Sequence, residues 1–283
     1  MLIMQVKKYD FCGCRVEIKH SAPIQEIFNY SRFPSGSATS DFSVEVIECD
    51  SLPPKNGKCL FSAENCSVYR DSDSIRTYSA MAVGENLMKD FACRVNTDKL
   101  YISSARATDE FLVFEGLRLP ELLLKKGVGL LHCSFIEHEG EAILFAGDKQ
   151  VGKSTQAALW EKYGSATAIN GDRAGLFIKN GVVMAGGVPY CGTSGICVNK
   201  QMPVKAIICL SKGTENTLKK QSPIESFMFL LGKFAYNTWV TDSVNMVSDL
   251  LTAIVENVPI YSYSCVKDES AVAFLKEKLE RMA

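Results

Sequence analysis

Hydrophobic and polar positions follow different rhythms in the two parts of the chain. In the first 118 residues, short runs alternate between apolar and polar side chains, and this period of two is typical of half-buried strands. The strand candidates cover residues 42–47, 58–61, 67–70, 75–78 and 100–103. Proline pairs, Asn-Gly and Asp-Ser-Asp clusters, all turn-forming, separate them. The pattern predicts a β-rich N-terminal domain over residues 1–118.

Residues 119–283 alternate between strand-like and helix-like segments, which is typical of an α/β domain. Helices are predicted at residues 117–126 (at the junction of the two domains), 155–163, 223–234, 242–255 and 268–282. Strands are predicted at residues 130–136, 141–146, 166–169, 204–210 and 260–264, and a further hairpin at 176–184 turns at Asn180-Gly181. Segments 130–136 and 141–146 are close enough to pair as a hairpin.

The composition is that of an ordinary globular protein, with 47% hydrophobic and 22% charged residues. The formal net charge is −1, and basic residues form only short pairs, so we expect no attraction to nucleic acid or to membranes. No run is long enough to span a bilayer, and the N-terminus lacks the apolar core of a signal peptide. Eleven cysteines, an odd number, without a secretion signal favour reduced thiols and a cytoplasmic location.

One motif stands out in the second domain. Gly147, four further residues and then Gly152-Lys153-Ser154 form the pattern G-x-x-x-x-G-K-[ST] of a phosphate-binding loop. The apolar segment before the motif is typical of a buried strand, and the segment after it has helical spacing. Because this is the context that the motif requires, a nucleotide site is favoured over a bland glycine-rich turn.

A loop of this kind surrounds phosphate oxygens with backbone N–H groups and with the positive end of the following helix. Lys153 is predicted to reach the terminal phosphates, and the Ser154 hydroxyl to bind Mg²⁺. The expected cofactors are therefore ATP and Mg²⁺. The predicted nucleotide-binding residues are Gly147, Asp148, Lys149, Gln150, Val151, Gly152, Lys153, Ser154 and Thr155.

Two further residues are candidates for chemistry. Asp172 follows the strand after the loop helix, where a carboxylate can hold the metal ion or take a proton from an acceptor hydroxyl. An Asp that caps a turn is the alternative. His132 lies with Ser134 on one face of the strand before the loop strand. A lone strand histidine is more often a hydrogen-bonded structural residue than a catalytic one, so both interpretations of His132 stay open.

In the N-terminal domain, Arg70, Arg76 and Tyr78 are candidates for a substrate-lining face. Solvated strand residues are the favoured interpretation, because polar and aromatic strand residues commonly face water.

Four segments together carry a resemblance to a known family. They are Leu131-His-Cys-Ser134, the phosphate-loop motif, Asn170-Gly-Asp-Arg173 and Gly187-Val-Pro-Tyr-Cys-Gly192. From about residue 117 onward the chain resembles HPr kinase/phosphorylase-like proteins, which share a phosphate-loop fold with phosphoenolpyruvate carboxykinases. It is most similar to their stand-alone bacterial branch, the HPr serine kinase-like proteins. The resemblance implies a P-loop kinase domain of this type over residues 119–283, beside the smaller β-rich domain.

The resemblance also implies roles for matched positions. The loop residues would bind ATP phosphates and Mg²⁺, and Asp172 would act as general base toward a serine hydroxyl and as a metal ligand. His132 would lie beside the transferred phosphoryl group.

Departures from the family pattern shift the expected acceptor. Gly171 stands where HPr kinases carry the first of two adjacent aspartates, and Lys149-Gln150 replaces their Ser-Gly. A Cβ at Gln150 restricts a turn that glycine makes freely. The Glu-x-Arg-Gly segment that serves HPr recognition has no match. We therefore expect the acceptor to be a serine or other hydroxyl of a peptide, protein or small molecule rather than HPr.

Three functions compete on these residues. The first is an ATP-dependent kinase with Lys153, Mg²⁺ and Asp172 in the roles above. The second is a nucleotide-binding regulatory module with little or no catalysis, which Gln150 and Gly171 favour. The third is a carboxykinase-like lyase, which needs a second metal site and an oxaloacetate-binding arginine that the sequence does not assemble.

Overall fold

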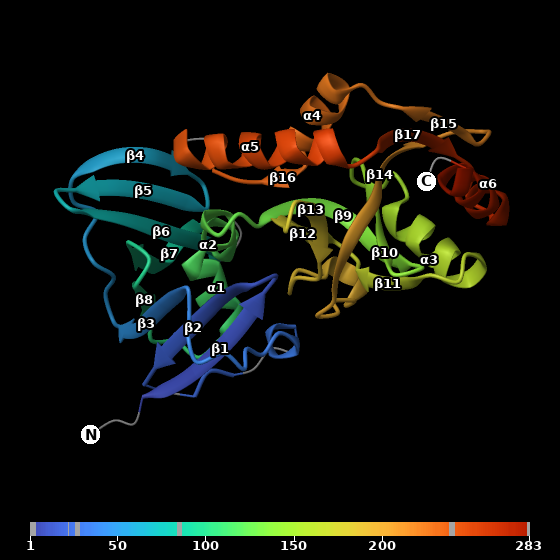
Figure 1. Cartoon of the computed structure of the whole chain (residues 1–283). Helices are drawn as coiled ribbons and strands as arrows, with labels where there is room; N and C mark the ends of the chain where they lie inside the picture. Colours follow the sequence, from blue (N-terminus) through green and yellow to red (C-terminus); the bar gives the residue numbers. More distant parts are fainter. Residues whose placement is uncertain (1–3, 22, 26–28, 84–86, 238–240, 282–283) are drawn as a thin grey trace. The chain divides into compact units, whose positions relative to one another are not determined.

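The computed structural model describes residues 4–21, 23–25, 29–83, 87–237 and 241–281 (Figure 1). The chain divides into two compact units, Met1–Leu122 and Leu123–Ala283. Strands and helices occur in both units, so the structure belongs to the mixed α/β class, as the sequence pattern predicts.

The described residues of the first unit form one eight-stranded sheet. Its strands are β1 (Gln5–Phe11), β2 (Cys14–His20), β3 (Phe42–Cys49), β4 (Lys58–Ala63), β5 (Cys66–Asp71), β6 (Ser74–Val83), β7 (Leu87–Val95) and β8 (Lys99–Ser103). Their order in space is β1-β2-β3-β8-β7-β6-β5-β4. β3 runs parallel to both of its neighbours, and the other pairs are antiparallel. The five strand candidates predicted within residues 1–118 coincide with β3, β4, β5, β6 and β8, whereas β1, β2 and β7 were not predicted.

Two short helices follow this sheet, where the sequence predicted one. The prediction of a single helix over 117–126 is wrong at its start. α1 (Glu110–Leu117) is followed by Arg118 as its C-cap, and α2 (Leu119–Lys125) begins directly after this residue. Arg118 takes a left-handed conformation with φ 54°, which ends α1. The Asp109 carboxylate caps the start of α1 by accepting from the backbone N–H of Leu112 at 3.2 Å.

The second unit is built from nine strands and four α-helices within its described residues. The strands are β9 (Gly129–His138), β10 (Glu141–Ala146), β11 (Thr167–Asn170), β12 (Arg173–Lys179), β13 (Val182–Gly186), β14 (Gln201–Lys212), β15 (Thr217–Lys220), β16 (Phe234–Ala235) and β17 (Ile260–Cys265). The α-helices are α3 (Lys153–Tyr163), α4 (Pro223–Leu231), α5 (Thr241–Asn257) and α6 (Glu269–Arg281). Each predicted strand of this unit coincides with an observed one.

Strands β9 and β14 pair with more strands than any other strand of the sheet in the second unit. β9 pairs with β10, β11, β12 and β16, and β14 pairs with β10, β13 and β17. The two predicted hairpins, β9–β10 and β12–β13, are both present. β10 therefore lies between β9 and β14, antiparallel to the first and parallel to the second, and its residues are almost completely buried.

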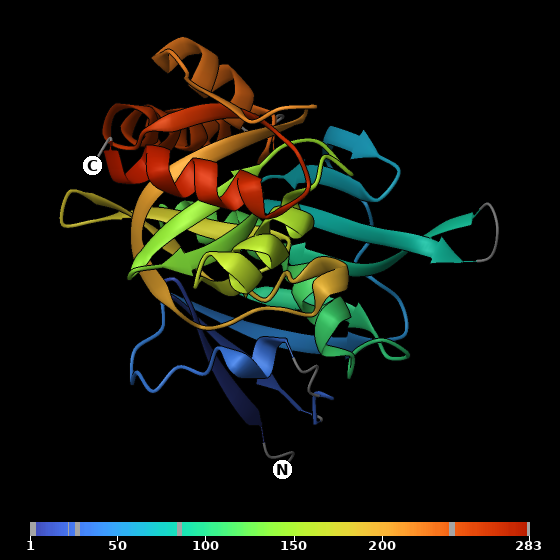
Figure 2. The ribbon, with the colours of Figure 1, turned by 90° about the vertical axis from the view of Figure 1, so that its right-hand side faces the viewer.

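Helices cover both faces of the β10–β14–β17 region. Leu144 of β10 belongs to a buried cluster with residues of α4 and α5, whereas Ile143 and Phe145 belong to a second cluster with residues of α3 and α6. Alternate residues of one strand thus enter different cores, as the period of two requires. Figure 2 shows α3 and α6 on the face of this region that is turned toward the viewer.

The prediction of a helix over 223–234 is wrong at its end. α4 stops at Leu231, and Gly232 follows as its C-cap. Phe234 and Ala235 then turn into strand β16, which pairs with Leu131 and Leu130 of β9. Pairing with a buried strand outweighs the helical propensity of these residues. Among the described residues, no helix has the length and apolar character needed to cross a membrane.

Truncation of Leu144 tests the core around β10. This side chain is fully buried, so Leu144→Ala should lower the free energy of unfolding of the second unit by about 2–5 kcal/mol. The control Ile178→Ala, at a side chain that is 46% exposed in the same unit, should change it by less than about 0.5 kcal/mol. Urea unfolding followed by amide hydrogen exchange of the second unit measures both. Equal effects would show that β10 is not in the core.

Candidate functional site

The predicted phosphate loop connects β10 to α3. β10 ends at Ala146 and α3 begins at Lys153, so the loop has a buried strand before it and a helix after it. Gly147 and Gly152 have φ values of 153° and 117°. A Cβ at Gly147 would approach the Val151 side chain to 2.9 Å, so this position requires glycine.

Gln150 adopts a left-handed backbone with φ 65°. This conformation costs a residue with a Cβ roughly 1–2 kcal/mol relative to a right-handed one. The sequence analysis expected a side chain here to restrict the turn. The loop nevertheless makes the turn, and it stores this strain at Gln150.

Lys153 holds the loop from inside. Its side chain is 9% exposed, and Nζ donates hydrogen bonds to the carbonyl oxygens of Gly147 at 3.0 Å and Asp148 at 2.9 Å. Burial lowers the pKa of Lys153, and the nearby Asp172 carboxylate opposes this shift. The ammonium group therefore lies against the loop, where it donates hydrogen bonds to two of its backbone carbonyl groups.

Asp172 stands on a turn that the Asn170 side chain builds. Asn170 is buried, and its Oδ1 accepts hydrogen bonds from the backbone N–H groups of Asp172 and Arg173, each at 3.0 Å. Its amide group donates to the Val188 carbonyl at 2.6 Å. The backbone carbonyl of Asp172 in turn accepts from the N–H of Cys133 on β9 at 3.0 Å. This network fixes Asp172 between β11 and β12, a role for Asn170 that sequence reasoning missed.

The glycine-rich segment after β13 packs against the same turn. A Cβ at Gly171 would lie 1.9 Å from Oγ of Ser194, and a Cβ at Gly192 would lie 3.0 Å from Cβ of Asp172. The Arg173 guanidinium lies over the Tyr190 ring at 4.9 Å. With Ser194 in this position, a side chain at position 171 would collide with it, and Asp172 is the one carboxylate at this turn.

His132 is brought to Asp172 by strand pairing. Arg173 is the direct partner of His132 in the β9–β12 ladder, and Nδ1 of His132 lies 3.5 Å from Oδ1 of Asp172. Burial lowers the pKa of His132, and the positive charge of Lys153 lowers it further, against the raising effect of Asp172. The imidazole is thus neutral at pH 7 and remains 40% exposed. Ser134, on the same strand face, donates to the Gly171 carbonyl at 3.3 Å.

Two cavities flank the phosphate loop. The first, of about 350 Å³, is lined by Leu130, His132, Gly147, Asp148, Lys149, Arg173, Gly232, Lys233, Phe234 and Ala235. The second, of about 310 Å³, is lined by Val151, Gly152, Thr155, Gln156, Lys212, Gly213, Cys265, Val266 and Lys267. The first part of the loop lines the first cavity, and the end of the loop with the start of α3 lines the second.

Lys233 is a second residue that sequence reasoning missed. It follows the Gly232 cap of α4, and its Nζ lies 2.5 Å from Oδ1 of Asp148, which lowers the pKa of that carboxyl. Nothing in the local sequence distinguishes Lys233 from a surface lysine at a helix end. Lys233 lines the first cavity because Phe234 and Ala235, which follow it in the chain, pair with β9.

The residues present fit a magnesium ion that is bound mainly through a nucleotide. Ser154 is exposed at the start of α3, and the Asp172 side chain is 29% exposed. The described residues contain no group of three or more His, Cys, Asp or Glu side chains arranged to hold a metal ion. Mg²⁺ in phosphoryl-transfer sites typically needs only one or two protein oxygens, because phosphates and water supply the rest.

Comparisons with known proteins give distant likenesses among solved structures. No protein-family model matches the sequence, and no curated protein matches it. Among solved structures, the HPr(Ser) kinase/phosphatase from Coxiella burnetii is similar at a TM-score of 0.32 and 14% identity, over 54% of this chain and 93% of that chain. A likeness of this strength does not assign a family or a function.

The electrostatics of His132 predict its titration. Its pKa should lie below the ordinary histidine value, should fall further in Asp172→Asn, and should rise in Lys153→Met, because these changes remove a negative and a positive neighbour. Proton NMR titration of the imidazole resonances measures this, with His132→Gln assigning the signal among the three histidines of the chain. A higher pKa in Asp172→Asn would contradict the placement of the two side chains.

Proposed function

We propose that this protein is an ATP-dependent kinase of the HPr kinase-like type, which transfers the γ-phosphoryl group to a hydroxyl acceptor. The observation that carries the proposal is the meeting of two features at one cavity. Residues 147–149 of the phosphate-loop motif line one part of it, and His132 and Arg173, whose side chains contact Asp172, line another. Phosphoryl transfer needs this combination of a phosphate cradle with a carboxylate beside the acceptor.

The loop would hold the nucleotide phosphates through the backbone N–H groups of residues 147–155. The first N–H groups of α3 have no acceptor within the helix, so they are available to an anion. Lys153 would exchange its bonds with the Gly147 and Asp148 carbonyls for bonds with the terminal phosphates. Mg²⁺, held by Ser154 and Asp172, would supply further positive charge where negative charge accumulates in the transition state.

Asp172 would act as the general base. The acceptor oxygen attacks the γ-phosphorus, the bond to the β–γ bridging oxygen breaks, ADP leaves, and the acceptor proton passes to the Asp172 carboxylate. The neutral His132 imidazole would hold this carboxylate in place and would lie beside the phosphoryl group. Asn170 would fix the turn, because it bonds the backbone on both sides of the Asp172 peptide.

The two cavities would separate the two substrates. We assign the acceptor to the cavity lined by His132 and Arg173, since both of these side chains contact Asp172. The nucleoside would occupy the cavity beside Thr155 and Lys212. The acceptor would be a serine or other hydroxyl of a peptide, protein or small molecule.

A nucleotide-binding regulatory module with little or no catalysis is the second candidate. The observation that favours it is the packing of Gly171 against Ser194, which leaves one carboxylate at the turn. In that case residues 119–283 would bind nucleotide without transferring phosphate.

The phosphate loop is tested by Lys153→Ala. This change removes the only side-chain cation expected on the terminal phosphates, so nucleotide affinity should fall at least tenfold, as the loss of a charge-assisted hydrogen bond of about 1.5–3 kcal/mol implies. Lys162→Ala, on the exposed face of the same helix, is the matched control and should bind normally. Calorimetric titration with ATP and Mg²⁺ measures both. Unchanged affinity in Lys153→Ala would refute the nucleotide site.

Asp172→Asn separates the kinase from the binding module. The amide keeps the size of the side chain but cannot take a proton, so transfer should drop by about 10²–10⁴-fold while ATP stays bound. Asp249→Asn, on the exposed face of α5, should leave both unchanged. Transfer of label from γ-labelled ATP to compounds of a cell extract measures the rate. If the wild-type protein binds ATP but labels nothing, the regulatory-module reading replaces the kinase.

A further inference from the structure

The sheet of the first unit contains a gap where one strand ends early. β8 pairs with β7 only along residues 99–102, opposite residues 92–95 of β7, and it ends at Ser103. β7 itself begins at Leu87, and residues 87–90 pair with β6 on their other side. Among the described residues, the main chain of residues 87–91 has no strand beside it on the β8 side.

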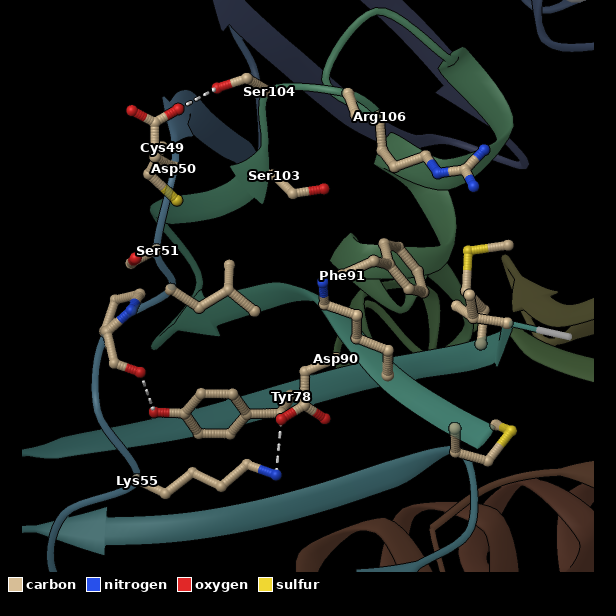
Figure 3. A pocket seen from close by; sticks show the side chains of 17 residues that line it. Cys49, Asp50, Ser51, Lys55, Tyr78, Asp90, Phe91, Ser103, Ser104 and Arg106 are labelled. Atoms are coloured by element: carbon tan, nitrogen blue, oxygen red, sulfur yellow. Dashed lines mark hydrogen bonds and ion pairs between the residues drawn. The ribbon is translucent and has the colours of Figure 1, made fainter. Parts of the chain in front are cut away.

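β8 lies between β3 and β7, and β3 ends at Cys49, opposite Ser103, the last residue of β8. Beyond this point the loop after β3 and the first residues of β7 line a common space. The space between them is a cavity of about 1070 Å³ that residues 103–106 close at one end (Figure 3). We call this cavity the strand slot.

Interactions within the first unit hold the walls of the strand slot in place. The hydroxyl of Tyr78 donates to the carbonyl oxygens of Pro53 at 3.0 Å and Pro54 at 2.8 Å, which fixes the loop after β3. Lys55 of the same loop forms an ion pair with Asp90 of β7 at 2.6 Å. Tyr78 is only 1% exposed, so the interpretation of this residue as a solvated strand residue is wrong.

The side chains of the strand slot combine apolar surface with unpaired positive charge. Leu52, Met81, Met88 and Phe91 supply the apolar part. The charges of Lys55 and Asp90 neutralise each other, whereas Lys89 and Arg106 are exposed and have no ion-pair partner among the described residues. Asp50, at the far wall, accepts from the Ser104 hydroxyl at 3.4 Å. The lining carries three cations and two anions, which favours an occupant with negative charge.

We propose that the strand slot binds an extended peptide segment with acidic side chains, which adds to the sheet beside residues 87–91 of β7. Alternate residues of an open strand edge direct N–H and C=O groups outward, and an added strand satisfies them. The open edge spans about 17 Å, the length of a five-residue strand. Acidic side chains of the peptide face Lys89 and Arg106, and apolar ones contact Met88 and Phe91.

A library of random eight-residue peptides displayed on phage tests this proposal with the full-length protein. The enriched peptides should be acidic, and their synthetic forms should protect from hydrogen exchange those amides of residues 87–91 that point away from β6. Methylation of alternate peptide N–H groups should weaken binding at least tenfold, because it removes the main-chain donors of the added strand. The double variant Lys89→Glu/Arg106→Glu should weaken binding by at least as much. Lys58→Glu, an exposed cation on β4 outside the strand slot, is the control and should bind normally.

Several outcomes would overturn the proposal. They are an absence of any enriched peptide, enriched peptides that bind the double variant as tightly as the wild type, and protection confined to other strands. Unchanged affinity after N-methylation would show that no strand is added. Because Lys89 and Arg106 are exposed, both substitutions should leave the fold intact, and amide exchange of β3 and β6 checks this directly.

Discussion

The pairing requirement of one buried strand underlies the candidate site. β9 is buried along nearly its whole length, and a buried backbone group without a partner costs free energy comparable to a lost hydrogen bond. Its edges are therefore satisfied by β10, β11, β12 and β16, and by two single hydrogen bonds. In these bonds the N–H groups of His132 and Cys133 donate to the carbonyl oxygens of Lys233 and Asp172. These same partners carry the phosphate loop, the aspartate turn and the lysine after α4. The candidate site is therefore assembled by the segments that complete the hydrogen bonding of β9.

Charge balance then decides how the site is arranged. Lys149, Lys153, Lys233 and Arg173 bring four positive charges to the region, and Asp148 and Asp172 bring two negative ones. Three of the cations have a neutral or anionic contact: two carbonyls for Lys153, Asp148 for Lys233, and Asp172 with the Tyr190 ring for Arg173. Contacts of a cation with carbonyl groups and rings are weaker than those a phosphate offers.

The sequence predicted the elements well because their signals are local. Period-two runs, the Asn180-Gly181 turn and the loop motif each act over a few residues, and the strands of the second unit coincide with those signals. The relations that build the site are not local. The Asn170 amide reaches Val188, and Lys233 reaches Asp148, across chain separations that no periodicity encodes. β16 was missed for the same reason, since its long-range pairing with β9 sets where this strand forms.

The contact between positions 171 and 194 also limits how this turn can change. Oγ of Ser194 occupies the place that a Cβ at Gly171 would need, and it is itself bonded to the Cys191 carbonyl at 2.7 Å. A mutation that adds an acidic side chain at position 171 alone would break this packing before it could contribute a charge. Glycine at position 194 would remove the two atoms that a Cβ at position 171 would approach most closely. Substitutions at the two positions are therefore expected to be non-additive, because residues in contact are energetically coupled.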